Sequence, residues 1–223
     1  MNKKLFIEAI LKFVIGVLIV GVLIFLPANS LYYYNGWLFM GLLFIPMFIA
    51  GIVMMIKSPG LLKSRLNAKE KESEQKEVVV LSSVMFICGF ILAGLNYRFD
   101  WIQLPDYVVF IASFIFVISY MLYAEVLREN TFLSRTIDVQ KNQQVIDKGL
   151  YSIVRHPMYT ITIFLFLSIP LILNSPVSFI IFLIYPFIIV KRINNEELVL
   201  EKKLKGYKEY KNKVKYKLFP LIW

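Results

Sequence analysis

The apolar stretch MYTITIFLFLSIPLILNSPVSFIIFLIYPFIIV, residues 158–190, decides how this chain folds, because it has the pattern of two short helices joined by a tight turn. The turn is Leu173-Asn-Ser-Pro176, which is typical of a chain reversal and too short to hold a domain. Each apolar segment is shorter than the about 20 residues that a helix needs to cross the hydrocarbon core. Pro170 and Pro186 lie within these segments, and membrane helices tolerate proline where neighbours satisfy the freed backbone groups. We therefore predict a short helical hairpin in the membrane, kinked at its prolines.

Four longer apolar runs precede this hairpin, and each is long enough to form a membrane-spanning helix. They cover residues 5–26, 37–56, 78–95 and 107–124. The 223-residue chain is 58% hydrophobic and only 18% charged, which is more apolar surface than one soluble core can bury. The sequence therefore predicts an all-α integral membrane protein with about six transmembrane helices, the last two of which form the hairpin.

Basic residues are concentrated in the segments that this topology places on one side of the membrane. Of the 25 Lys and Arg residues, 23 fall in those segments, and only Arg98 falls on the opposite side. Because positively charged segments stay in the cytoplasm, both termini are predicted to be cytoplasmic. Basic segments that face anionic lipid also explain the net charge of +10, and no nucleic-acid-binding module is recognisable. We predict the lipid bilayer, and no nucleic acid, as a partner.

The chain divides by chemistry near residue 125. Residues 1–124 are predicted to form four transmembrane helices, with a charged cytoplasmic loop at residues 57–77. Residues 125–223 hold a polar loop, the hairpin and an amphipathic C-terminal cytoplasmic helix. Most of the polar residues that could carry chemistry lie in this second region.

The predicted C-terminal helix places a glutamate within an apolar stripe. The residues of this stripe, spaced four, three, four and three apart, are Ile193, Glu197, Leu200, Leu204 and Tyr207. Glu197 is therefore predicted to face the protein body or the bilayer surface, where a carboxylate needs a cationic partner. Arg192 lies about 140° away around an ideal helix, so the two side chains meet only across a bent helix end or by holding a ligand between them. Gly206 is predicted to end the helix.

Two polar clusters flank the hairpin, and ionisable residues in a membrane are costly enough to suggest a function. The first runs from Gly149 to Tyr159 and contains the only histidine of the chain, and the second runs from Lys191 to Glu197. Pro157 suits the first turn of a helix, where neighbouring free N–H groups can bind a carboxylate. The two clusters together indicate a pocket at the membrane interface that could hold an amphiphilic cofactor and a lipophilic substrate.

Several common sites are absent from the sequence. It has no G-x-G-x-x-G motif, no P-loop and no G-x-S-x-G elbow, so dinucleotide, P-loop and serine-hydrolase sites are not supported. One histidine and one cysteine cannot build the common zinc sites, and a single cysteine cannot form an intramolecular disulfide. We predict no metal.

Three spaced motifs lie within residues 125–223. They are Gly149-x-Tyr151-x-x-x-Arg155-His156-Pro157-x-Tyr159, Arg192-x-x-x-Glu196-Glu197 and Gly206-Tyr-x-x-Tyr210. As a set, these motifs resemble the isoprenylcysteine carboxyl methyltransferase family, which is related to the membrane phospholipid N-methyltransferases. The stretch from Arg128 to Gln140 and the ending from Val214 to Pro220 resemble the bacterial branch, which implies a prokaryotic cell membrane. The resemblance also implies a helical bundle whose C-terminal part encloses S-adenosylmethionine.

The resemblance implies roles for individual residues. Those expected to contact S-adenosylmethionine are Gln140, Gln143, Gln144, Val145, Ile146, Tyr151, His156, Pro157, Met158, Tyr159 and Glu197. Arg192 is expected to face the lipophilic methyl acceptor, and Arg192, Glu197 and His156 are the candidate catalytic residues. Glu197 could offset the positive charge of the cofactor. A carboxylate acceptor held by Arg192 would need no base, whereas an amine or thiol acceptor would lose a proton to His156 or Glu197.

The sequence also departs from the pattern of the family. Lys217 stands where members often carry arginine, and lysine cannot reproduce a planar bidentate fork. Asn194 and Asn195 stand where some relatives are acidic. We therefore predict a membrane methyltransferase that uses S-adenosylmethionine to methylate the carboxylate of a lipophilic acceptor. N-methylation of a phospholipid or amine, S-methylation of a thiol, and a non-catalytic membrane binding protein or transporter with the same fold remain alternatives.

Overall fold

A computed structural model describes residues 3–66, 73–133 and 139–223, and these residues form helices and loops without a strand. In chain order the helices are α1 (Lys3–Ala28), α2 (Tyr34–Lys57), α3 (Pro59–Leu66), α4 (Ser73–Phe99), α5 (Asp106–Glu129), the 3-10 helix η1 (Gly149–Ser152), α6 (Pro157–Ile172), α7 (Pro176–Phe182), α8 (Tyr185–Lys203) and α9 (Tyr207–Lys213). The predicted all-α fold is confirmed.

Five helical segments of the described residues are long and apolar enough to cross a membrane. They are Lys3–Ala28, Tyr34–Lys57, Gln75–Phe99, Asp106–Glu129 and Pro176–Lys203, the last of which comprises α7 and α8. Helix α6 is also apolar, but its 16 residues are fewer than the about 20 that a full crossing needs. The chain is therefore a multi-pass membrane protein, and the exact count of six spans stays a prediction.

The predicted hairpin turn is confirmed between α6 and α7. Asn174 adopts the left-handed conformation, with φ of 51°, and the Ser175 hydroxyl caps α7 by accepting the N–H of Ser178 at 3.2 Å. The second arm differs from the prediction because α7 stops at Phe182 and a new helix, α8, starts at Tyr185. Pro186 lies in the first turn of α8, where a missing N–H costs little. The charged C-terminal helix is thus a continuation of the second arm.

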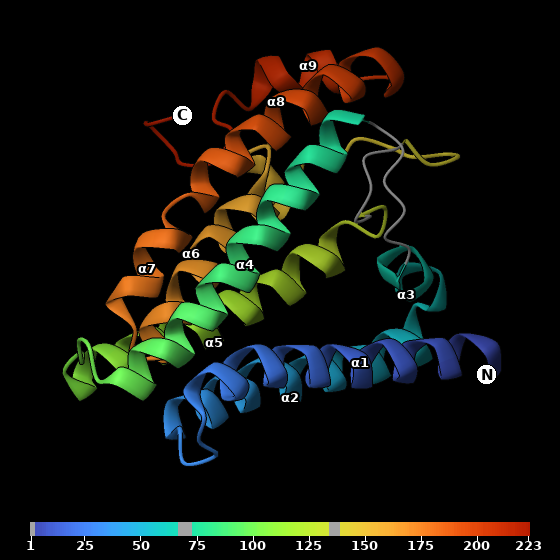
Figure 1. Cartoon of the computed structure of the whole chain (residues 1–223). Coiled ribbons are helices and arrows are strands. Elements are labelled where there is room, and N and C mark those ends of the chain that lie inside the picture. The colour runs from blue at the N-terminus through green and yellow to red at the C-terminus, as the bar shows by residue number, and fades with distance from the viewer. Residues whose placement is uncertain (1–2, 67–72, 134–138) are drawn as a thin grey trace.

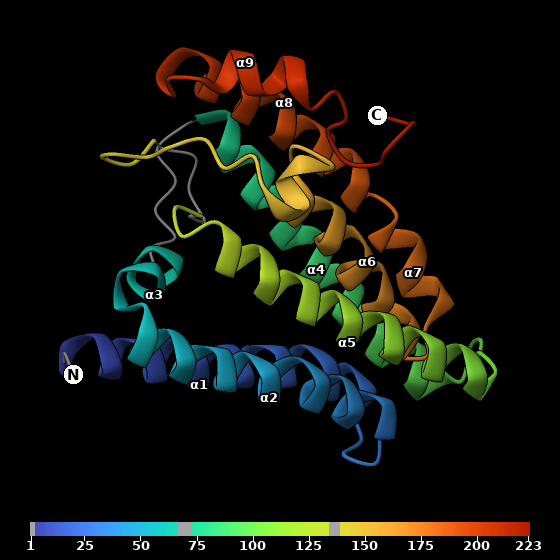
Figure 2. The same ribbon diagram turned by 180° about the vertical axis from the view of Figure 1, so that it is seen from behind.

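Helices α1 and α2 lie side by side and cross the bundle of α4 to α8 at an angle (Figures 1 and 2). Helix α1 meets α4 at Gly94, where a Cβ atom would lie 2.5 Å from the carbonyl oxygen of Ile24. Helix α4 meets α7 at Gly89, where a Cβ atom would lie 2.3 Å from the ring of Phe182. Small residues allow membrane helices to approach closely, so these two glycines set the spacing of the bundle.

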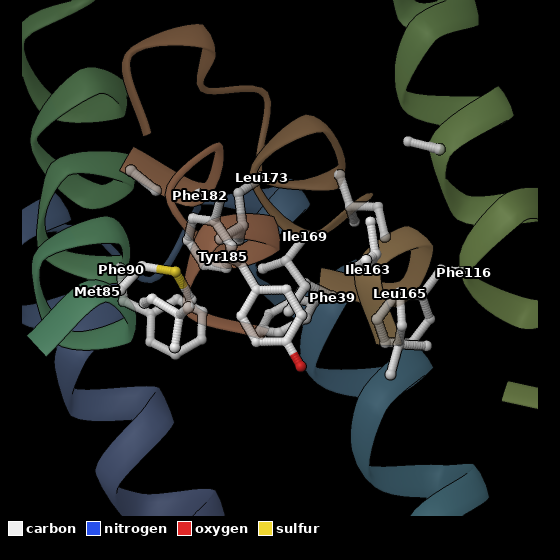
Figure 3. Close-up of a cluster of buried hydrophobic side chains, with 14 of the residues drawn as sticks. Phe39, Met85, Phe90, Phe116, Ile163, Leu165, Ile169, Leu173, Phe182 and Tyr185 are labelled. Carbon is white, nitrogen blue, oxygen red and sulfur yellow. The ribbon is translucent and has the colours of Figure 1, made fainter. Parts of the chain in front are cut away.

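The buried core lies between α2 and helices α4 to α8 (Figure 3). The side chains labelled there are Phe39, Met85, Phe90, Phe116, Ile163, Leu165, Ile169, Leu173, Phe182 and Tyr185. Other faces of the helices carry large exposed apolar side chains, as expected where a protein meets lipid. Because α6 supplies much of this core, its N-terminal end, where the first polar cluster lies, is held in a fixed place.

The segment predicted as a charged loop, residues 57–77, contains a helix of its own. Helix α3 buries Leu61 and Leu62 and exposes Lys63. Its Ser64 hydroxyl donates to the carbonyl oxygen of Leu133 at 3.5 Å, so α3 lies against the chain that follows α5. Helix α4 begins at Ser73, and residues 67–72 lie outside the described part of the chain.

Candidate functional site

The first polar cluster starts at a glycine that no other residue could replace without movement. Gly149 has φ of 57°, and a Cβ atom there would lie 1.7 Å from Oε1 of Glu129. The Glu129 carboxylate occupies this space because it accepts the N–H of Leu150, with Oε2 at 3.0 Å. Glu129 thereby holds the start of η1, the short helix that carries the buried Tyr151.

The next residues, Arg155 and His156, are held by the C-terminal segment of the chain. The Arg155 N–H donates to the carbonyl oxygen of Tyr216 at 2.9 Å, and the His156 N–H donates to that of Lys217 at 3.0 Å. His156 is the residue before α6, and Pro157 is the first residue of that helix, as predicted. Figure 2 shows the start of α6 beside α8, with α9 across the same end of the bundle. Segments far apart in sequence therefore meet at the two polar clusters.

Glu197 is buried, as the apolar stripe predicts, with 4% of the residue exposed. Its Oε1 accepts the Nε–H of Arg155 at 2.7 Å and lies 3.3 Å from Nε2 of His156. Its Oε2 lies 3.3 Å from Nζ of Lys217. The cationic partner that the sequence requires is therefore Arg155, supported by Lys217.

Arg192 does not serve as the partner of Glu197, which corrects the pairing considered from sequence. Helix α8 continues unbroken through both residues, so a five-residue spacing leaves them on different faces. Arg192 instead donates from Nε to the Tyr159 hydroxyl at 2.8 Å, and this hydroxyl donates to Oε2 of Glu196 at 2.5 Å. The two adjacent glutamates thus have different environments. Glu196 lies beside Tyr159, and Glu197 lies beside Arg155.

A pocket that is partly open to solvent lies between α6, α8, α9 and the polar loop. The sequence-predicted residues that line it are Gln143, Gln144, Val145, Ile146, Tyr151, His156, Met158, Tyr159 and Arg192. One end is charged, with Arg192 and Glu196, and another part is apolar, with Val145, Leu200 and Leu204. Its enclosed cavity volume is about 100 Å³, less than the roughly 300–1,000 Å³ typical of small-molecule pockets, so a nucleoside-sized ligand would also occupy the open side of the pocket.

Three of the predicted site residues do not line this pocket. Gln140 supports the wall instead, since its side-chain nitrogen donates to the carbonyl oxygen of Phe132 at 2.5 Å and its N–H donates to Oε1 of Gln143 at 2.8 Å. Pro157 starts α6, and Glu197 lies behind Arg155 and His156. Whether any of the predicted residues contacts a ligand stays a prediction.

Nine further residues line the pocket that the sequence did not select. They are Asn130, Phe132, Leu133, Arg155, Glu196, Leu200, Leu204, Tyr207 and Tyr210. The sequence could have indicated five of them. Arg155 and Glu196 belong to the polar clusters, and Leu200, Leu204 and Tyr207 belong to the inward-facing stripe. Asn130, Phe132 and Leu133 lie in the stretch from Arg128 to Gln140 that resembles the bacterial branch, but the sequence gave these three residues no individual role.

Two aromatic residues reach the pocket from α9 because the chain turns sharply before that helix. Helix α8 ends at Lys203, and Gly206, which was predicted to end this helix, adopts the left-handed conformation with φ of 87°. The turn places Tyr207 and Tyr210 in the pocket lining. The Tyr210 hydroxyl there donates to the carbonyl oxygen of Tyr151 at 2.7 Å.

Burial keeps the tyrosines of this wall protonated. It raises the pKa values of Tyr151, Tyr207 and Tyr210 well above the ordinary value, and for Tyr207 the nearby carboxylates of Glu197 and Glu196 raise the pKa further. The three phenol groups are therefore neutral at physiological pH and can both donate and accept hydrogen bonds.

The fold and the site together define a multi-pass membrane protein with a mixed polar and apolar pocket at one end of its helical bundle. Residues 110–202 match the isoprenylcysteine carboxyl methyltransferase (ICMT) family, and this match spans most of α5, the first polar cluster, the hairpin and nearly all of α8. This match confirms, for residues 110–202, the resemblance to a family of methyltransferases that the sequence motifs indicate. No curated protein sequence matches the chain.

Proposed function

We propose that this protein uses S-adenosylmethionine to methylate a carboxylate on a lipophilic acceptor, at the cytoplasmic face of a prokaryotic cell membrane. The observation that supports this proposal most strongly is the composition of one pocket. It combines most of the residues that the family resemblance assigns to the cofactor with Arg192, which the resemblance assigns to the acceptor. Such a pocket would hold the two reactants next to each other.

The residues of the pocket fit the chemistry of S-adenosylmethionine. The apolar side chains of Val145, Leu200 and Leu204 suit a planar base, and the carboxylate of Glu196 suits ribose hydroxyls or an ammonium group. The buried hydroxyl of Tyr207 finds no hydrogen-bond partner among the described residues, which leaves it available to a ligand. When bound, S-adenosylmethionine supplies an electrophilic methyl group on a positively charged sulfur.

Arg192 would hold the acceptor. Its Nε–H bond to the Tyr159 hydroxyl and the position of its guanidinium, 5.9 Å from the centre of the Tyr159 ring, fix the side chain on the pocket wall. A guanidinium binds a carboxylate through parallel hydrogen bonds and so can orient it. A carboxylate is already a nucleophile, so the protein needs only to align it and exclude water.

Glu197 would act as a positioning residue rather than as a direct contact of the cofactor. It lies outside the pocket lining, and both of its oxygens face cationic or histidine side chains. Its carboxylate orients Arg155 and His156, which do line the pocket. Glu196 then provides the carboxylate that faces a ligand.

Transfer of a labelled methyl group would test this proposal. The purified protein in lipid nanodiscs would be incubated with methyl-labelled S-adenosylmethionine and a prenylcysteine acceptor, and the product treated with base. We expect a base-labile label, because methyl esters hydrolyse. A base-stable label would instead support amine or thiol methylation, and no label in this acceptor or in membrane lipids would contradict the proposal.

Arg192→Lys gives a sharper form of the same test. Hydrogen bonds to charged groups contribute about 1.5–3 kcal/mol, so loss of the guanidinium should lower kcat/KM by about 10–150-fold. Arg128→Lys is the matched control, because Arg128 is exposed and pairs with Glu125 outside the pocket. Equal activity of the two variants would contradict the proposal that Arg192 binds the acceptor.

A further inference from the structure

Tyr207 is a buried residue whose polar group has no visible function in the fold. Only 4% of the residue is exposed, and its hydroxyl finds no hydrogen-bond partner within residues 3–66, 73–133 and 139–223. A buried hydroxyl without a partner is costly, so native proteins rarely keep one without a reason. Because Tyr207 also lines the pocket, the missing partner is best supplied by a ligand there.

The surroundings of Tyr207 indicate which part of a ligand it would meet. Its ring packs in an apolar cluster with Leu204, Val145 and Leu200. Its hydroxyl lies near the carboxylates of Glu197 and Glu196, and Glu196 also accepts the hydroxyl of Tyr159. The planar base of S-adenosylmethionine suits the apolar face of this cluster, and its ribose hydroxyls suit the neighbouring carboxylates.

We propose that the hydroxyl of Tyr207 hydrogen-bonds the adenosyl half of S-adenosylmethionine, at the base or the ribose. This inference rests on the proposed function and adds a cofactor-binding residue to it. Burial and the nearby carboxylates keep the phenol neutral, so it can donate to a ring nitrogen or accept from a ribose hydroxyl. The residue would thus recognise the cofactor without taking part in the methyl transfer.

Tyr207→Phe separates a ligand contact from a structural role. Because the hydroxyl makes no bond within the described fold, its removal should leave the melting temperature of the ligand-free protein unchanged or raise it by about 2–4 °C. The same change should weaken binding of S-adenosylhomocysteine by about threefold to tenfold, as expected for one lost hydrogen bond. Both quantities can be measured on purified protein in detergent, by thermal unfolding and by calorimetry.

Tyr210→Phe is the matched control. This tyrosine also lines the pocket, but its hydroxyl donates to the carbonyl oxygen of Tyr151. The same chemical change should therefore lower the melting temperature, because it removes a bond of the fold and leaves a carbonyl without its donor. A fall in the melting temperature of Tyr207→Phe like that of Tyr210→Phe would overturn the inference.

Binding of adenosine tests which half of the cofactor Tyr207 contacts. Adenosine carries the base and the ribose without the amino-acid part, and its affinity can be measured by competition with labelled S-adenosylhomocysteine. We expect Tyr207→Phe to weaken adenosine and S-adenosylhomocysteine by the same factor. A loss for S-adenosylhomocysteine alone, or for neither ligand while the wild type binds both, would overturn the inference. Failure of the wild type to bind S-adenosylhomocysteine would instead contradict the proposed function itself.

Discussion

Glu197→Gln removes the charge that holds the two polar clusters together. The side chain of Glu197 is 5% exposed and that of Arg155 is 4% exposed, with 2.7 Å between Oε1 and Nε. Breaking a buried ion pair by changing one partner costs about 3–5 kcal/mol. The cost here should be lower, about 2–3 kcal/mol, because the glutamine oxygen still accepts and Arg155 keeps its bonds to the carbonyl oxygens of Val214 and Lys215.

Thermal unfolding in detergent measures this effect directly. For a chain of this size a loss of 1 kcal/mol lowers the melting temperature by about 2–4 °C, so Glu197→Gln should lower it by about 4–12 °C. Binding of S-adenosylhomocysteine should fall as well, because Arg155 and His156 lose the carboxylate that orients them.

Glu201→Gln provides a control one turn further along α8. Glu201 pairs with Lys211 at 2.5 Å, but both side chains are partly exposed, so this pair should contribute less than about 1 kcal/mol. If Glu197→Gln were as mild as Glu201→Gln in both stability and binding, the positioning role of Glu197 would be refuted.

Three glycine variants test the packing that positions the site, each by thermal unfolding. Gly149→Ala should cost at least about 2 kcal/mol, because alanine disfavours the left-handed backbone and its Cβ would collide with Glu129; a neutral result would mean that Glu129 moves freely. Gly89→Ala should cost about 1–3 kcal/mol through its contact with Phe182, and wild-type stability would contradict the close approach of α4 and α7. Gly51→Ala, in a helix with open space around it, should be stabilising by about 0.5–1 kcal/mol.

The features that sequence alone predicted well are set by local chemistry. The turn around Asn174 and the start of α6 at Pro157 follow from residues whose backbone preferences are strong. The inward position of Glu197 follows from helical periodicity, because a residue within an apolar stripe shares the burial of that stripe. These predictions needed no knowledge of distant segments.

The features that sequence missed depend on distant segments or on competing local signals. The partner of Glu197 is Arg155, which is 42 residues earlier in the chain and held by the segment around Lys217. No periodicity within α8 could reveal that contact. The sequence also did not predict the break between α7 and α8. Pro186 was expected to kink a single helix, whereas it lies in the first turn of a new one.

The match of residues 110–202 supports a methyltransferase of the ICMT family, and the pocket suggests a separate role for each group of residues. Residues that the resemblance assigns to the cofactor fall into two groups, those that line the pocket, such as Tyr151 and Met158, and those that support its wall, such as Gln140. This division has a physical basis, because a binding residue must be held by others to keep its geometry. Substitutions in the two groups should therefore differ, the first affecting binding and the second also affecting stability.

Equilibrium binding of S-adenosylhomocysteine to the purified protein is the most direct measurement of whether the pocket is a cofactor site. We expect saturable binding at one site per chain. Glu197→Gln should weaken this binding and also lower the stability, whereas Tyr207→Phe should weaken binding without lowering the stability. Absence of binding by a well-folded wild-type protein would contradict the proposed methyltransferase function and favour a non-catalytic membrane protein with the same fold.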